Sequence, residues 1–135
     1  MTNNPLSLEW QTLQHGHEQH EKNALLIKLV CIALCVFGLG LQVPLPWLAC
    51  CVLLLWAQEA IFKTYQSRIA ERLLRVEQLL AQAAPEQPAM QLHTEWAAQR
   101  PGVMGLVASY GMSACKPTVA FPYVPMLVMG ALLGA

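Results

Sequence analysis

Two long apolar stretches lie close together in the first half of the chain. The first covers Ala24–Leu41 and the second covers Leu45–Phe62, with only three residues between them. Each is about as long as the roughly 20 residues that a helix needs to cross a bilayer core. Because so short a connection requires antiparallel helices, residues 24–62 are predicted to form a transmembrane helical hairpin.

Helical spacing continues beyond both outer ends of this hairpin. Before it, side chains recur every three or four residues, the period of one helix face, in an N-terminal seam of Leu6, Trp10, Leu13, His17 and His20. After it, the same period gives a second seam of Phe62, Tyr65, Ile69, Leu73, Val76 and Leu80, continued by Ala83. Residues 1–23 and 63–84 are therefore predicted to be amphipathic helical extensions, the second ended by Pro85 and Pro88.

Two interpretations of these seams are open. The second seam approximates a heptad repeat, which favours a coiled coil between copies of the chain. Alternatively, the second extension packs against the N-terminal seam of its own chain or lies along the membrane. We prefer packing between the two seams of one chain, because both extensions run directly out of the hairpin.

A third apolar stretch covers residues 118–135 and is interrupted by Pro122 and Pro125. We expect it to span the membrane, with a re-entrant segment as the alternative, because its length is close to the minimum for a span. Gly130 and Gly134 form a G-x-x-x-G pair, which permits close helix packing. Residues 85–117 are expected to be a cytoplasmic linker with a weakly apolar interfacial helix over residues 102–115.

The basic residues predict the orientation. None lies in the turn of the hairpin, and all eight fall on the side of its outer ends: Lys22, Lys28, Lys63, Arg68, Arg72, Arg75, Arg100 and Lys116. The positive-inside rule then predicts a multi-pass membrane protein with a cytoplasmic N-terminus. If residues 118–135 span, the C-terminus is periplasmic. The polar residues ahead of the first stretch argue against a signal peptide.

Composition narrows the function. Hydrophobic residues make up 56% of the chain and charged residues 12%, against a usual charged share of about 25%. The net charge of zero gives no indication of nucleic-acid binding. All eight acidic residues are Glu, and no phosphate-binding loop, dinucleotide fingerprint or nucleophile elbow occurs. We therefore expect no enzyme and no cofactor, and we interpret the five cysteines as small packing residues.

The histidines and one glutamate are the candidate chemical groups. His15, His17, His20 and His93 suggest a metal site, but only His17 and His20 share a helix face, and zinc needs three or four ligands. No metal is predicted, although this pair is a candidate for pH sensing. Glu59 is ionisable at membrane depth and is therefore a functional candidate. We predict that it forms an interfacial ion pair with Lys63, one helical turn away.

The run Trp56–Glu77, WAQEAIFKTYQSRIAERLLRVE, resembles a pattern in small uncharacterised bacterial multi-span inner-membrane proteins. The matching positions are Trp56, Glu59, Ala60, Arg68 and Arg72, and the run Phe121–Tyr123 is similar to the aromatic start of their last span. The resemblance implies a role in phage defence or in conflict between bacteria. It carries over no catalytic residue.

Together these features predict an all-α, non-enzymatic bacterial inner-membrane protein that self-assembles through its helices. The resemblance suggests a membrane-perturbing effector of a phage-defence system. The alternative is an accessory or immunity-type subunit that binds a larger protein partner. The expected partners are the lipid bilayer and either further copies of the chain or another membrane protein, with no nucleic acid.

Overall fold

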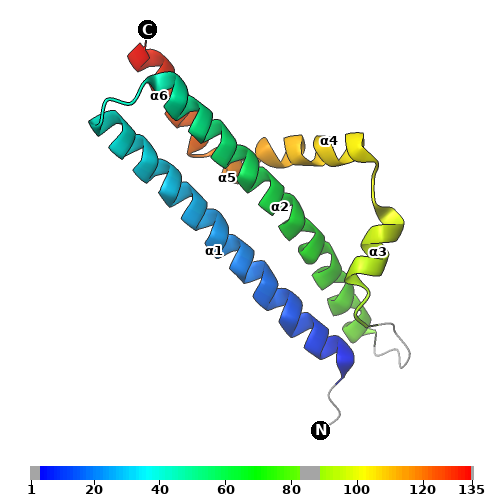
Figure 1. Cartoon of the computed structure of the whole chain (residues 1–135). Coiled ribbons are helices and arrows are strands. Elements are labelled where there is room, and N and C mark those ends of the chain that lie inside the picture. The colour runs from blue at the N-terminus through cyan, green and yellow to red at the C-terminus, as the bar shows by residue number, and fades with distance from the viewer. Residues whose placement is uncertain (1–3, 83–88, 135) are drawn as a thin grey trace.

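The computed structural model describes residues 4–82 and 89–134, and within these ranges all the regular structure is helical, as predicted. Two long helices, α1 (Pro5–Gly40) and α2 (Leu45–Ala81), lie side by side and antiparallel (Figure 1). Four shorter helices follow: α3 (Leu92–Gln99), α4 (Val103–Ala114), α5 (Pro117–Ala120) and α6 (Tyr123–Gly134).

Helix α1 is continuous and contains residues 5–23 of the predicted N-terminal extension and all of the first apolar stretch except its last residue, Leu41. It begins at an N-cap, Asn4, whose side-chain oxygen accepts a hydrogen bond from the backbone N–H of Leu6 at 3.1 Å. Pro5 suits the first helical position, where a backbone donor has no partner inside the helix. The 36 residues extend about 54 Å at 1.5 Å per residue, which exceeds the roughly 30 Å of a bilayer core.

A tight turn joins the two long helices. The backbone N–H of Val43 donates to the carbonyl of Gly38 at 2.8 Å, and Gln42 has a φ of 57° in the left-handed region. Gly38 allows the helices to approach closely here, because a Cβ on it would lie 2.4 Å from the side chain of Leu48. The turn therefore fixes which residues of α1 and α2 face each other.

The C-terminal half of α2 packs against the N-terminal half of α1, so the two predicted seams meet within one chain. Leu6, Leu13 and Val76 are buried together, and the side chains around them include Trp10, Ile69, Leu73 and Leu80. Tyr65 is the exception in the second seam, because its side chain is exposed. The predicted helix end at Pro85 and Pro88, and the seam position Ala83, lie outside the described residues.

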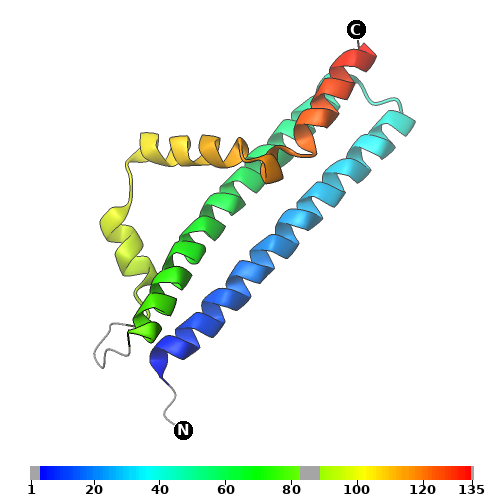
Figure 2. The ribbon, with the colours of Figure 1, turned by 180° about the vertical axis from the view of Figure 1, so that it is seen from behind.

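Helix α2 is the element on which the rest of the described chain is assembled. Helices α1, α3, α4, α5 and α6 all contact it, and no backbone contact joins α1 to α6 within their described ranges. Figure 2 shows α6 running along α2 towards the end where the turn lies, while α4 extends away from the pair of long helices. Helices α1 and α6 therefore both lie on α2 and are separated from each other.

The third apolar stretch forms two helices instead of one. It divides between α5 and α6 at Phe121 and Pro122. Helix α6 has 12 residues, or about 18 Å of length, which is shorter than a bilayer core. Pro125 lies in its first turn, where a proline removes no hydrogen bond.

Within residues 89–117, the predicted linker contains one more helix of eight or more residues than expected. Helix α4 matches the predicted apolar helix at residues 102–115 closely, but α3 was not predicted. Its sequence, LHTEWAAQ, is short and has no regular apolar spacing. Contacts with α2 stabilise α3. These contacts depend on tertiary packing, so the sequence pattern of α3 alone does not predict this helix.

Candidate functional site

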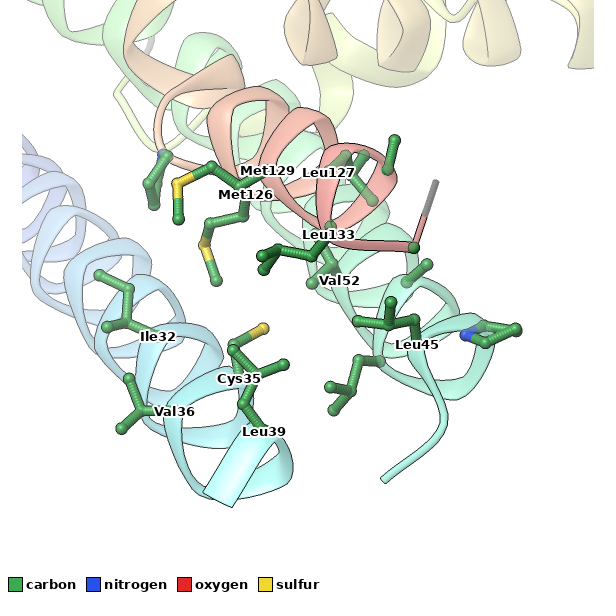
Figure 3. Close-up of a pocket in the computed structure, with 17 residues that line it drawn as sticks. Ile32, Cys35, Val36, Leu39, Leu45, Val52, Met126, Leu127, Met129 and Leu133 are labelled. Carbon is green, nitrogen blue, oxygen red and sulfur yellow. The ribbon is translucent and has the colours of Figure 1, made fainter. Parts of the chain in front are cut away.

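An apolar groove of about 950 Å³ lies between α1 and α6, with α2 as its floor. Figure 3 shows side chains from all three helices pointing into it. The labelled ones are Ile32, Cys35, Val36 and Leu39 from α1, Leu45 and Val52 from α2, and Met126, Leu127, Met129 and Leu133 from α6. Among the described residues, no charged side chain lines the groove, so its surface suits an apolar occupant.

The two predicted packing glycines both line this groove, but they differ in their surroundings. A Cβ on Gly134 would lie 3.0 Å from the Leu45 side chain, whereas a Cβ on Gly130 would meet nothing within 4 Å. Gly134 is therefore close to α2 of its own chain. Gly130 instead faces open space, where an incoming helix can approach the α6 backbone closely.

A small buried core lies below the groove, where α1, α2 and α6 converge. It contains Cys31, Val52 and Tyr123, with Trp56 packed against it. The rings of Trp56 and Tyr123 are stacked at a centroid distance of 6.3 Å. This core holds α6 against the pair of long helices, and the groove opens between it and the turn.

A buried polar cluster follows this core, towards the outer ends of the helices. Glu59 is only 1% exposed. One of its oxygens lies 3.1 Å from Lys28 Nζ, and the other accepts a hydrogen bond from the Tyr123 hydroxyl at 2.6 Å. Lys28 also donates to the backbone carbonyl of Thr118. The cluster thus connects α1, α2, α5 and α6 through charge-assisted hydrogen bonds.

The predicted partner of Glu59 is therefore wrong. Its carboxylate pairs with Lys28 across the helix pair, not with Lys63 along α2. A helix surface places residues one turn apart only about 5–6 Å from each other at their Cβ atoms, yet the side chain of Glu59 points into the interface with α1. The role of Tyr123, which lies in the Phe121–Tyr123 run, was not predicted from the sequence.

A second ionic network links the outer halves of α1 and α2. Arg72 Nε lies 2.8 Å from Glu9 Oε1, and Arg72 Nη1 lies 2.8 Å from Glu95 of α3. The backbone N–H of Met90 also donates to Glu9 at 2.7 Å. Glu9 and Arg72 are each 3% exposed. Burial acts to raise the pKa of Glu9, but the bonds from Arg72 and Met90 outweigh it and hold that pKa below its usual 4.5.

The sequence contained a signal for this network that the seam analysis missed. Glu9 lies between Leu6 and Leu13 at spacings of three and four, and Arg72 lies between Ile69 and Val76 at the same spacings. Opposite charges therefore occupy matching places on the two faces that pack together. Only apolar and histidine positions were counted in the seams, so this complementarity was overlooked.

The three histidines of α1 make separate contacts. His20 packs with its ring centroid 6.0 Å from that of Phe62, and His17 accepts a hydrogen bond at its backbone carbonyl from Gln66 at 3.4 Å. His15 contacts Gln19 on its own helix. Within residues 4–82 and 89–134, no group of three or more metal-ligating side chains is found.

Comparisons of the chain with protein-family models, with curated proteins and with solved structures found no match.

Proposed function

We propose that the chain is a non-enzymatic integral protein of the bacterial inner membrane that self-assembles through the groove between α1 and α6. The observation that carries this proposal is the groove itself, a wide apolar surface on three helices. A second copy of the chain offers an apolar helix of matching chemistry as its occupant. Close packing between helices then supplies the association energy within lipid.

The surfaces of the long helices support a location in the membrane. Both helices are long and apolar enough to cross a bilayer, by length and composition. Only 11% of the most apolar window of α1, and 17% of that of α2, is buried within the chain. A soluble protein rarely exposes so much contiguous apolar surface, and a core helix of a soluble fold would bury it. Lipid therefore fits these surfaces better than water.

The proposed orientation has a cytoplasmic N-terminus and a C-terminal end on the periplasmic side. It follows from the basic residues, which avoid the turn. The path of α5 and α6 along α2 supports the second part. Lys116 lies 3.5 Å from Ser67 at one end of this path, and Gly134 lies beside Leu45 at the other. Ser67 and Leu45 are separated by about 33 Å of helix, close to the thickness of a bilayer core.

The groove is a better assembly surface than the second seam. Ile69, Leu73 and Val76 pack against the chain's own α1, so using them between copies would require this packing to separate. The groove needs no such rearrangement.

A single substitution tests the groove as the assembly surface. We expect Gly130→Leu to convert an oligomer into monomers, because a Cβ at this position meets no atom of its own chain within 4 Å and the leucine side chain then occupies space that an incoming helix would need. Gly40→Leu is the matched control. It adds the same side chain to open space near the turn, away from the groove, and should leave the oligomer intact. Native mass spectrometry from detergent measures the number of chains.

The outcome also separates the two functional classes. An oligomer that Gly130→Leu alone disrupts supports self-assembly, and loss of membrane potential on expression would then support a membrane-perturbing effector of the phage-defence type. A wild-type protein that is monomeric at all concentrations contradicts self-assembly. That result would favour an accessory subunit whose groove receives a helix of a larger partner.

A further inference from the structure

Helix α4 buries its polar side chains and exposes apolar ones. Its polar side chains, Ser109, Tyr110 and Ser113, are half-buried or buried. Its exposed residues are all Val, Met, Ala or Gly, namely Val103, Met104, Val107, Ala108, Gly111 and Met112. A helix packed on a protein in water normally shows the reverse pattern.

The apolar face of α4 is continuous and prominent. Met104 is 84% exposed and Val103 is 76% exposed. The spacing of its members, at three and four residues, places them in one stripe along the helix. Within residues 4–82 and 89–134, no side chain covers this stripe.

Hydrogen bonds place one end of α4 beside the predicted boundary between lipid and cytoplasm. The hydroxyl of Ser113 accepts a hydrogen bond from Thr64 at 2.8 Å, and the carbonyl of Ala114 accepts one from Trp56 at 3.2 Å. Thr64 lies two residues after the end of the second apolar stretch. From this contact α4 extends away from the long helices (Figure 1), in the region where headgroups and acyl chains meet.

Basic side chains flank both ends of the apolar stripe. Before it, the guanidinium of Arg100 lies 5.1 Å from the ring centroid of Trp96, and Arg68 lies 4.7 Å from the same centroid. After it, Lys116 is exposed. An apolar stripe with basic ends and an aromatic ring nearby is the pattern of helices that lie in a membrane interface.

We propose that α4 lies in the cytoplasmic leaflet, with its apolar stripe among the acyl chains and with Arg100 and Lys116 binding anionic lipid headgroups. This inference rests on the proposed membrane location of α1 and α2, but it is independent of self-assembly. Lipid fits the stripe better than a protein partner does, because basic residues at both ends complement the negative surface of that leaflet.

The test places one spin label at a time on a cysteine-free form of the full chain in vesicles. The variants are Met104→Cys on the stripe, Thr94→Cys on the exposed side of α3, and Phe37→Cys on the exposed side of α1. We expect oxygen, which concentrates in lipid, to relax the labels at 104 and 37. A water-soluble nickel chelate should relax the label at 94.

The label at 37 separates failure of this inference from failure of the membrane proposal. A chelate-accessible label at 104 with a lipid-exposed label at 37 overturns the inference alone. Chelate access at both positions overturns the membrane proposal as well. The label at 104 could also be shielded from both oxygen and the chelate, with the shielding lost when the protein is diluted in lipid. That result also overturns the inference, because a second copy would then cover the stripe.

Lipid composition tests the headgroup contacts. Native mass spectrometry should show that the purified protein retains phosphatidylglycerol in preference to phosphatidylcholine. The preference should fall about fivefold for each charge removed by Arg100→Gln or Lys116→Gln. Glu18→Gln is the control. It removes an exposed charge on a different part of the chain, helix α1, and should leave the preference unchanged. Equal retention of both lipids by the wild type overturns the assignment of anionic headgroups.

Discussion

Arg72→Met should destabilise the packing of the outer halves of α1 and α2 by about 3–5 kcal/mol. The substitution leaves the carboxylate of Glu9 buried with only the Met90 N–H among the partners described above. The volume of the side chain is roughly kept, so the loss comes from the uncompensated charge. Hydrogen exchange of the first turns of α1 measures the free energy of opening directly.

Two further variants distinguish this cause from a loss of packing. Adding Glu9→Gln to Arg72→Met should restore most of the lost stability, because it removes the buried charge. Glu95→Gln alone should have a small effect, since the Glu95 side chain is 30% exposed and water replaces its partner. An Arg72→Met variant as stable as the wild type would show that the network contributes nothing.

Lys28→Met should weaken the docking of α5 and α6 on the pair of long helices, at a cost of about 3 kcal/mol. Glu59 would retain only the hydroxyl of Tyr123 among its described partners, in surroundings too apolar to stabilise a carboxylate. The expected readout is roughly a hundredfold faster hydrogen exchange in α6.

Lys63→Met is the matched control for this experiment. It removes the same charge one turn from Glu59, but from a residue that does not pair with it in the structure. We expect a change of less than about 1 kcal/mol. Equal effects of the two lysine substitutions would contradict the cross-helix pairing and restore the prediction made from sequence.

The long helices were predictable because their apolar residues recur with a helical period over many turns. The partner of Glu59 was missed because sequence neighbours were considered before facing helices. The short turn at residues 41–44 brings Lys28 nearly level with Glu59 across the pair, so counting outward from the turn would have suggested this contact. The contribution of Tyr123 depends on how α6 docks, and no periodicity in the sequence specifies that.

The groove was likewise beyond sequence analysis. It exists because α6 is short, begins after a break at Pro122 and lies on α2 without backbone contact to α1. The sequence indicates that residues 118–135 are apolar and interrupted, but it does not indicate on which helix they dock. The burial of polar side chains and the exposure of apolar ones on α4 can likewise be recognised only when the buried and exposed sides of that helix are known.

In the proposed topology, α1 and α2 cross the membrane as a hairpin with both outer ends in the cytoplasm. Cysteine labelling in spheroplasts tests it most directly, on a cysteine-free chain that carries either Pro44→Cys in the turn or Gln14→Cys in the outer half of α1. We predict that a membrane-impermeant maleimide labels position 44 in intact spheroplasts and position 14 only after permeabilisation. Labelling of position 14 in intact spheroplasts, or of both positions only after permeabilisation, would contradict the account.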